Sequence, residues 1–336
     1  MYICLLRRDS GKMVAAMGNE ASATLDAWAI AHAAARAIGS FDVEVPGRFA
    51  LAANGGLHPV VAPEAAAVLS WNPASGWESA LAQDDPNRDL LELYLPISSA
   101  TAARPITIGH LGQSLDGFIA THSGDAICVT GPQNILHLHR LRALCDAVVV
   151  GAATVAVDNP RLTTRLVSGS NPVRVILDPG CRLPLAHTVF NDQAARTLRA
   201  CAAGNGAAAA ARNRGEDTLE VASVEGALDL KDLLRQLHAL GYSRIFVEGG
   251  GVTVSNFLSA GLLDRLHIAV APLFIGDGRP AIRLPPQIRL QDCLRLQPRI
   301  YSAGSDILFD CDLRAMAAGD MNGHDNSSST MIRRVL

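Results

Sequence analysis

One short stretch combines a carboxylate with three glycines at the end of an apolar run. Glu248 is followed by Gly249, Gly250 and Gly251, and residues 245–247 before it are Ile-Phe-Val. A carboxylate that ends a buried strand needs a partner or a ligand, because burying an unpaired charge is costly. Glycines let a backbone approach a phosphate closely, and the N-terminus of a following helix offers N–H groups to it. The alternative is an ordinary strand-to-helix turn, since a short glycine run is a weak signal.

A second group of polar residues surrounds the apolar run at 147–150. It comprises Arg142 before the run and Thr154, Asp158, Thr163 and Arg165 after it. Guanidinium forks match phosphate oxygens, so this group, together with the glycine-rich turn, favours a phosphorylated substrate and a dinucleotide. Two alternatives stay open: Arg142 is a solvated residue on a helix surface, and Asp158, which precedes Asn-Pro, serves only its turn.

No pattern of histidines, cysteines or carboxylates predicts a metal site. His137 and His139 lie two apart on an expected helix and so face different directions. The seven cysteines are odd in number, scattered and never spaced as C-x-x-C, which argues against a disulfide framework and a zinc knuckle. We expect most of them to be small core residues and the protein to bind no metal.

The composition favours a small-molecule partner. Hydrophobic residues make up 49% of the chain, charged residues 18%, and the formal net charge is -3. These values are typical of a soluble globular protein and give no electrostatic footprint for nucleic acid or an anionic membrane. There is no basic flank before an apolar N-terminal run and no apolar stretch long enough to span a bilayer. We therefore expect a cytoplasmic location.

The elements that must position these residues follow an alternating pattern. Apolar strands are expected at 106–111, 147–150, 173–177 and 245–247, and helices at 132–144, 230–240 and 252–260 lie between or after them. Uninterrupted apolar strands separated by helices predict an α/β fold with a mostly parallel sheet covered by helices on both faces. Late strands at 266–271, 299–303 and 307–311 have little room for helices between the last two, so the sheet should end antiparallel. A ligand then binds beyond the carboxyl ends of the parallel strands.

A chain of 336 residues is long enough for two domains. Residues 1–100 hold all three tryptophans and alanine-rich stretches, which predict a small α+β domain of unknown role. We expect helices at 27–37 and 62–69, then a helix followed by a strand within 78–95. A linker near 98–105 leads to a second domain at 101–314, in which residues 202–211 form a surface excursion. The polar residues 315–336 are expected to be disordered.

A series of short motifs makes the second domain recognisable. They are Ser114-Leu115-Asp116-Gly117, Val129-Thr130-Gly131, His139-Arg140-Leu141-Arg142 with Asp146-Ala147, Thr154-Val155-x-x-Asp158-x-Pro160-x-Leu162-Thr163, Pro172-Val173-Arg174-Val175-Ile176-Leu177-Asp178 and Val247-Glu248-Gly249-Gly250. From about residue 105 to 313 the chain resembles the C-terminal reductase domain of the bifunctional riboflavin-biosynthesis deaminase-reductases. The resemblance implies a dihydrofolate-reductase-like fold that binds NADPH and reduces 5-amino-6-(5-phosphoribosylamino)uracil or a related pyrimidine or pterin. Hydride would reach the sugar C1′ of an open-chain imine.

The resemblance also implies roles for individual residues. Thr154, Asp158, Gly249, Gly250 and Gly251 occupy NADPH-contacting positions. The positions that contact the substrate hold Arg142, Leu162, Arg165 and Glu248. The arginines would hold the substrate phosphate or the polar ring edge. Glu248 is also the expected catalytic residue, because a carboxylate beside the ribose could stabilise the cationic imine.

The chain departs from the family pattern in two places. Ala126 and Cys128 stand where the family usually has a serine that touches substrate and an aromatic residue that packs on the nicotinamide. Residues 1–100 contain only Cys4 and have no Glu two residues after His32 or His58, so the motifs of a zinc deaminase are missing. We expect neither deaminase activity nor zinc.

Two other readings remain. A degenerate family member would bind a nucleotide without turnover and have a regulatory role, as the residues at 126 and 128 suggest. An unrelated Rossmann dehydrogenase is weakened because no G-x-G-x-x-G opens the first strand-to-helix turn. The apolar run at 268–275 predicts a homodimer interface, although a core strand would explain it equally well.

Overall fold

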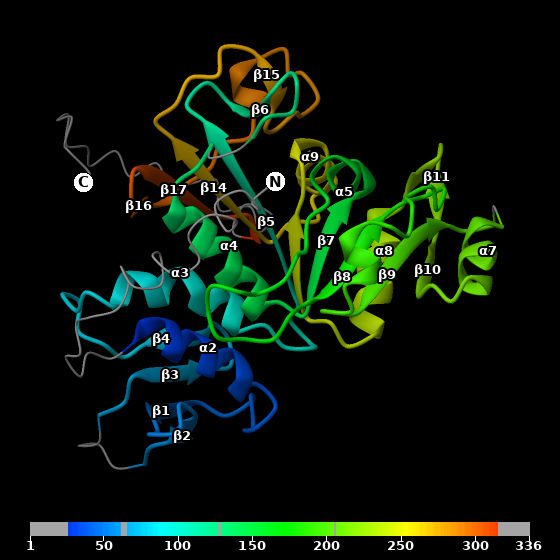
Figure 1. Ribbon diagram of the computed structural model, residues 1–336. Coiled ribbons are helices and arrows are strands. Elements are labelled where there is room, and N and C mark those ends of the chain that lie inside the picture. Colours follow the sequence, from blue (N-terminus) through cyan, green and yellow to red (C-terminus); the bar gives the residue numbers. More distant parts are fainter. Residues whose placement is uncertain (1–25, 62–65, 127–128, 205, 315–336) are drawn as a thin grey trace. The chain divides into compact units, whose positions relative to one another are not determined.

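The computed structural model describes residues 26–61, 66–126, 129–204 and 206–314 (Figure 1). These residues fall into two compact units. Unit 1 comprises the described residues up to 106 and residues 139–246, and unit 2 comprises 107–138 and the residues from 247 onward. The expected boundary near residue 100 stays a prediction, and the tail expected at 315–336 lies outside the described residues.

The first part of unit 1 is a small antiparallel sheet with helices. Its elements are α2 (Ala27–Ala37), β1 (Gly47–Leu51), β2 (Leu57–Pro59), β3 (Leu69–Asn72), β4 (Gly76–Ser79) and α3 (Arg88–Ser98), and the strand order is β2-β1-β3-β4. Asp26 caps α2 by accepting a hydrogen bond from the Trp28 N–H at 3.0 Å. The aromatic rings of Phe41, Phe49, Trp71 and Trp77 pack together.

The helix expected at 27–37 is confirmed, but the order expected within 78–95 is wrong. The strand β4 comes first and the helix α3 follows it. Trp77 pairs with Trp71 across the hairpin and both side chains are buried, so burial of the aromatic rings decides the structure there. Part of the helix expected at 62–69 lies outside the described residues, and Leu69 opens β3.

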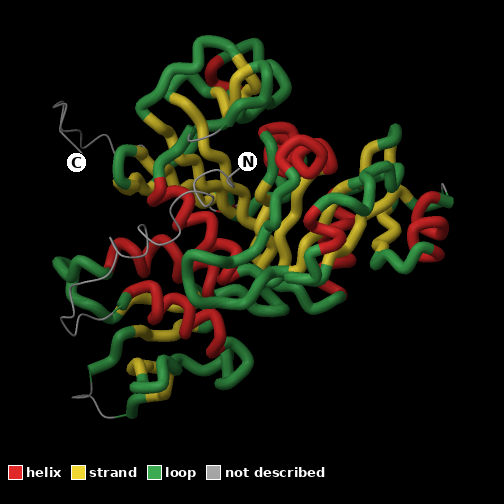
Figure 2. Tube along the Cα trace, viewed as in Figure 1, coloured by secondary structure: helices red, strands yellow, loops and turns green. Residues whose placement is uncertain are grey.

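The rest of unit 1 consists mostly of strands that alternate with helices (Figure 2), and its longer strands pair in parallel. Its elements are β7 (Ala147–Gly151), α5 (Ala152–Asp158), β8 (Val173–Leu177), α6 (Thr188–Asn191), β9 (Thr197–Ala202), α7 (Ala207–Asn213), β10 (Thr218–Val221), β11 (Ser223–Val224), β12 (Ala227–Leu228), α8 (Leu230–Ala239) and β13 (Arg244–Glu248), the last two residues of β13 belonging to unit 2. The order β10-β9-β8-β7-β13 places strands that are distant in sequence side by side. Consecutive residues of β7, β8 and β9 are buried, so both faces of these strands are covered. Part of the expected surface excursion forms the helix α7.

Unit 2 supplies the antiparallel end of the fold. Its elements are β5 (Ile106–Ser114), β6 (Phe118–Thr121), the first half of α4 (Pro132–Leu144), α9 (Gly251–Ser259), β14 (Arg265–Ala271), β15 (Gly278–Pro280), η1 (Leu290–Asp292), β16 (Arg299–Ala303) and β17 (Asp306–Asp312). Strand β14 pairs in parallel with β5 and antiparallel with β17, which pairs antiparallel with β16. The predicted α/β class, mostly parallel with antiparallel final strands, is confirmed.

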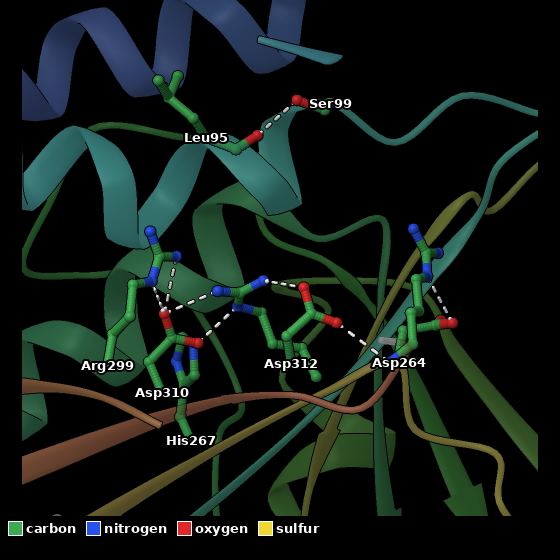
Figure 3. A network of polar contacts seen from close by, with 9 residues as sticks. Leu95, Ser99, Asp264, His267, Arg299, Asp310 and Asp312 are labelled. Atoms are coloured by element: carbon green, nitrogen blue, oxygen red, sulfur yellow. Dashed lines mark hydrogen bonds and ion pairs between the residues drawn. The ribbon is translucent and has the colours of Figure 1, made fainter. Parts of the chain in front are cut away.

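A buried charge network joins the final strands of unit 2 (Figure 3). Both carboxylate oxygens of Asp310 accept hydrogen bonds from Arg265, at 2.5 and 2.7 Å, and Asp310 also contacts His267 at 3.1 Å and Arg299 at 2.9 Å. Burial alone would raise the pKa of Asp310, but the hydrogen bonds from His267 and Arg265 outweigh it and hold the pKa well below its usual range. A carboxylate only accepts, so His267 donates from Nε2 and accepts at Nδ1 from His137 Nε2 at 3.0 Å.

The expectation that the cysteines form no disulfide is wrong at one pair. Cys181 and Cys201 are bonded, with their Cα atoms 6.1 Å apart. Cys181 lies in the turn after β8, and Cys201 lies near the end of the adjacent strand β9. The pairing follows from strand order, which the spacing of the cysteines does not show. Cys145 and Cys311 are buried free thiols, as expected for core residues, whereas Cys293 is exposed.

Candidate active site

The predicted substrate arginines lie in one hydrogen-bonded cluster in unit 1. Arg142 on α4 donates from Nη1 to the Thr163 carbonyl oxygen at 3.1 Å. Arg165 donates from Nη1 to the Thr163 hydroxyl at 2.7 Å. Both guanidinium groups are therefore hydrogen-bonded to the same residue, Thr163. We call Arg142, Thr163 and Arg165 the arginine cluster.

The sequence left two interpretations open for Arg142: a residue that binds phosphate, or a solvated residue on a helix surface. The burial of its side chain distinguishes them. Its side chain is only 4% exposed, so the alternative of a solvated helix residue is wrong. Leu162, next to the cluster, is 2% exposed and has a φ of 54°. A left-handed conformation at a leucine is strained, and its buried side chain holds the segment that carries Thr163 and Arg165.

His139 is hydrogen-bonded to the backbone of the arginine cluster. Its Nδ1 accepts a hydrogen bond from the Arg165 backbone N–H at 2.9 Å. Burial, and after it the charges of Arg142 and Arg165, lower the pKa of His139 to about 3. The imidazole is therefore neutral near pH 7 and can act as an acceptor. The sequence places His139 in a family motif but does not indicate this role, because the Arg165 N–H that it accepts from lies 26 residues further along the chain.

Thr154 and Asp158 lie on α5, directly after the end of β7. Both residues are half-buried, and they are one helical turn apart, so they lie on the same face of the helix. Asn159 ends the helix in a left-handed conformation with φ 42°, and its N–H donates to the Val155 carbonyl at 3.0 Å. The residues predicted to contact the cofactor in this part of the chain thus lie at the carboxyl edge of a parallel strand, as the fold class requires.

Glu248 and the glycines form the turn into α9 in unit 2. Glu248 is half-buried at the end of β13, Gly250 is the N-cap of α9 and Gly251 is its first residue. A Cβ on Gly251 would lie 1.9 Å from the Ala281 carbonyl oxygen, so packing of the chain already requires glycine there. Gly249 and Gly250 are half-buried and lie beside the N-terminal N–H groups of the helix, which suit an anionic group.

The described units divide the predicted site residues between them. Unit 1 holds Arg142, Leu162 and Arg165 together with Thr154 and Asp158, and unit 2 holds Glu248 and Gly249 to Gly251. Unit 1 brings the two arginines together through Thr163. That all nine residues border one cleft stays a prediction.

Three further positions were singled out in the sequence, 116, 126 and 128. Asp116 accepts hydrogen bonds from the Ser114 hydroxyl at 2.5 Å and from the Gly276 N–H at 2.7 Å. These bonds, led by that of Ser114, lower the pKa of Asp116 and tie two turns of unit 2 together. Ala126 is half-buried, and Cys128 lies outside the described residues.

The part of the chain that the structure describes contains no group of His, Cys, Asp and Glu side chains arranged to hold a metal ion. The expectation of a metal-free protein stays a prediction. The same residues include no helix that is both long and apolar enough to cross a bilayer.

The chain matches known proteins over its second part. The model of the RibD C-terminal domain matches residues 105–307. The chain is 34% identical over 214 residues to the 2,5-diamino-6-ribosylamino-4(3H)-pyrimidinone 5′-phosphate reductase of Methanothermobacter thermautotrophicus, covering 62% of this chain and 97% of that protein. It is 35% identical over 179 residues to the riboflavin biosynthesis protein RibD of Aquifex aeolicus, covering 53% of this chain and 49% of that one.

Solved structures agree with these matches. The deaminase and 5-amino-6-(5-phosphoribosylamino)uracil reductase of Thermotoga maritima is 25% identical with a TM-score of 0.53, covering 67% of this chain and 60% of that chain. RibD of Acinetobacter baumannii is 26% identical with a TM-score of 0.54, covering 68% of this chain and 63% of that chain. The chain thus spans nearly all of the Methanothermobacter thermautotrophicus reductase but only about half to two thirds of the other three proteins. Because the family model matches more than half of it, the chain belongs to the RibD C-terminal domain family.

Proposed function

We propose that the protein is an NADPH-dependent reductase of 5-amino-6-(5-phosphoribosylamino)uracil, or of a closely related pyrimidine, in riboflavin biosynthesis. The observation that supports this most is the arginine cluster, in which a buried guanidinium and a second one share Thr163. The cluster brings two guanidinium groups together, and guanidinium forks match phosphate oxygens, so it suits a phosphorylated substrate. Family membership supports the same reaction.

The residues present fit the cofactor that the family implies. The N-terminus of α9 with Gly249 and Gly250 offers N–H groups to a phosphate, and the Thr154 hydroxyl and Asp158 lie at the carboxyl edge of β7. Gly251 would contribute indirectly, because its lack of a side chain lets the start of α9 pack closely against Ala281. Bound NADPH would supply the hydride.

The protein's own residues would orient the substrate and stabilise charge. Arg142 and Arg165 would bind the substrate phosphate or the polar edge of its ring, and Leu162 would pack beside them. Glu248 would lie near the ribose carbon that accepts hydride. Its carboxylate would stabilise the positive charge of the imine. Because the carboxylate is already in position, it would not have to reorient during the reaction.

The experiment mixes the purified full chain with NADPH and each of two pyrimidines. One carries the 2-amino group named for the archaeal relative, and the other is the uracil named for the Thermotoga maritima protein. We expect loss of NADPH absorbance with at least one of them and a ribitylamino product by mass spectrometry. Absence of oxidation with both substrates would contradict the proposal. Cofactor binding without oxidation would instead support the degenerate, regulatory family member that Ala126 suggests.

We further propose that the protein is cytoplasmic, acts as a homodimer and has no deaminase activity. The dimer proposal is supported by the second half of the apolar run at 268–275, where Leu273 is 40% and Phe274 is 73% exposed. The first half belongs to β14 and is partly core. Light scattering of the native protein and of a Phe274→Ser variant tests the dimer proposal, which a monomeric native protein would contradict.

The proposed absence of deaminase activity has its own test. Stoichiometric zinc in the purified protein, or ammonia release from an aminopyrimidine, would contradict it.

A further inference from the structure

The N-terminal segment, which comprises the described residues up to 100, packs on the helix that carries Arg142. The Arg140 guanidinium on α4 lies 5.5 Å from the ring centroid of Trp28 on α2 and 5.7 Å from that of Tyr94 on α3. The two rings pack edge to face, 5.6 Å apart, and both are buried. A guanidinium this close to an aromatic ring is attracted to it. Two helices of the segment therefore contact α4 at one residue (Figure 1).

The helix α2 lies inside unit 1 and has almost no solvated side. Of its residues only Arg36 is exposed, and all but two of the others are buried. A helix that is covered all round belongs to the interior of a protein. The Trp77 Nε1–H of its own segment donates to the Ala34 carbonyl at 3.1 Å, and Arg244 on β13 donates to the Ala35 carbonyl at 2.8 Å. The N-terminal sheet is thus bound to the rest of unit 1 through α2.

The loop that follows Arg165 packs against α4 and α2 at a glycine. Gly169 has a φ of 150°, and a Cβ on it would lie 2.6 Å from the Cβ of Ala143 on α4 and 3.4 Å from Nε2 of His32 on α2. Any side chain there would have to displace the loop from α4. His32 also stacks on Trp28, with the ring centroids 5.6 Å apart. The stacked pair on α2 therefore contacts both α4 and this loop.

Hydrogen bonds within the loop connect Gly169 to the arginine cluster. The Thr164 N–H donates to Asn171 Oδ1 at 2.8 Å, and the Thr164 hydroxyl donates to the Ser170 carbonyl oxygen at 3.1 Å. The two ends of the loop are thereby tied together. Thr164 lies in the chain between two members of the cluster. A displacement of the loop at Gly169 therefore reaches the cluster through this closed turn.

Helix α4 provides a second connection. Arg140 and Ala143 are three residues apart and share one face of the helix, which contacts the N-terminal segment and the loop. His139 and Arg142 share an adjacent face by the same spacing, and both are hydrogen-bonded to the backbone of the cluster. Because a helix moves as a unit, a shift of the first face also moves the second.

We propose that Trp28 and His32 are positioning residues of the substrate site, which act through α4 and the loop at 164–171 to hold Arg142 and Arg165 in place. This inference rests on the proposed function, since it assigns the arginine cluster to the substrate. A misplacement of about 1 Å in such groups can lower a rate by about 100-fold, so the cluster needs rigid support. The segment that supplies it lies outside the residues matched by the family model.

The first experiment measures KM and kcat of the full chain with Trp28→Leu, Trp28→Phe and the control Trp71→Leu. Trp71 is a buried ring of the same segment that packs on Phe41 and Trp77. We expect Trp28→Leu to raise KM for the pyrimidine by roughly 3- to 30-fold and to leave KM for NADPH unchanged. Trp28→Phe keeps a ring beside Arg140 and should restore most of the native value. Trp71→Leu should keep the native KM, because a smaller folded fraction lowers the apparent kcat and not KM.

A pair of glycine variants tests the loop without changing an aromatic ring. Gly169→Ala should raise KM for the pyrimidine over the same range, because the added Cβ would push the loop away from Ala143. Gly215→Ala is the matched control, since Gly215 also has a positive φ, 82°, but nothing lies within 4 Å of an added Cβ. In an Arg165→Ala background Gly169→Ala should add little, because the group that the loop positions is gone.

The outcomes separate this inference from the proposed function. If the native protein reduces a pyrimidine and both Trp28→Leu and Gly169→Ala keep its KM, the positioning role is wrong while the reductase proposal stands. An equal rise in KM with Trp71→Leu would also overturn the inference, since general loss of packing would then explain it. If Trp28→Leu does not fold, the two glycine variants decide. If the native protein reduces neither pyrimidine, the proposed function fails and the inference fails with it.

Discussion

At the scale of single residues, Arg165 allows the clearest test of the substrate site. It is half-buried and reaches Thr163 with one guanidinium nitrogen. We expect Arg165→Ala to raise KM for the phosphorylated substrate by roughly 10- to 100-fold, because a charge-assisted hydrogen bond contributes about 1.5–3 kcal/mol. Steady-state kinetics with Arg161→Ala, an exposed arginine nearby, as the control checks this. A normal kcat/KM would remove Arg165 from the site.

Glu248 should affect the chemical step more than substrate binding. The change Glu248→Gln keeps the shape of the side chain and removes its charge. We expect kcat to fall by about 100-fold with a smaller change in KM, since removing a group that stabilises transition-state charge typically costs about 3 kcal/mol. Single-turnover measurements separate binding from reduction. A change confined to KM would assign Glu248 to substrate binding only.

His139 gives the stability of the protein a predicted pH dependence. Its pKa is lowered to about 3 in the folded chain by burial, Arg142 and Arg165, whereas an unfolded histidine titrates near about 6.5. Between these values the unfolded chain binds a proton that the folded chain excludes, so stability is complete above the upper value and is lost as pH falls through this window.

A non-titrating replacement at this position tests that prediction. Asn in His139→Asn can still accept a hydrogen bond from the Arg165 N–H and carries no titrating group. We expect urea unfolding between pH 7 and 4 to show a smaller loss of stability for the variant than for the native protein. His267, whose pKa burial also lowers, contributes equally to both proteins. Parallel pH profiles would contradict the assignment to His139.

At the scale of elements, the disulfide fixes the turn after β8 to β9. Cys181 and Cys201 are separated by 20 residues, and closing a loop of this length stabilises a protein by about 3 kcal/mol. We expect a thiol reductant to lower the free energy of unfolding by about that amount in the native protein and to have no effect on Cys181→Ala. The control Cys293→Ser changes an exposed free thiol and should keep the response. An unchanged unfolding curve in reductant would contradict this role.

Burial and long-range contacts explain which of the expected elements match the structure. The strand expected at 173–177 matches β8 because its β-branched residues favour a strand, and the one charged residue within it, Arg174, is buried with Asp192 as its partner. Within 78–95 the sequence pattern was misleading, because the hairpin of Trp71 and Trp77 forms through cross-strand burial. The burial of Arg142 was likewise not predictable from helix periodicity, since the backbone of Thr163, distant in sequence, supplies its partner.

At the scale of the whole molecule, the N-terminal segment is joined to the second part of unit 1 by specific contacts. The Arg140 guanidinium lies 5.5 Å from the Trp28 ring centroid and 5.7 Å from that of Tyr94, and Arg244 donates to the Ala35 carbonyl at 2.8 Å. Arg140 is on α4, two residues before Arg142. The N-terminal segment is therefore packed against α4, the helix that carries Arg142 of the arginine cluster.

A double-mutant cycle tests whether these parts of unit 1 unfold together. We expect Trp28→Leu and Arg140→Met to show a coupling free energy of about 0.5–2 kcal/mol in urea unfolding, as a partly desolvated cation–π contact provides. Trp77→Leu with Arg140→Met is the matched control and should be additive, because Trp77 packs at an angle against the other aromatic rings of its own sheet. Additivity in both pairs would show that the segment is energetically separate.

The α/β class and the family motifs could be predicted from the sequence, because the periodicity of apolar residues and the turn-forming residues are local properties. The tertiary structure was needed to show that Thr163 links two arginines, that Cys181 pairs with Cys201, and that the Asp178 carboxylate is buried in its own loop. Each of these depends on which strands are neighbours. That order is set by burial summed over distant segments, and no window of sequence contains it.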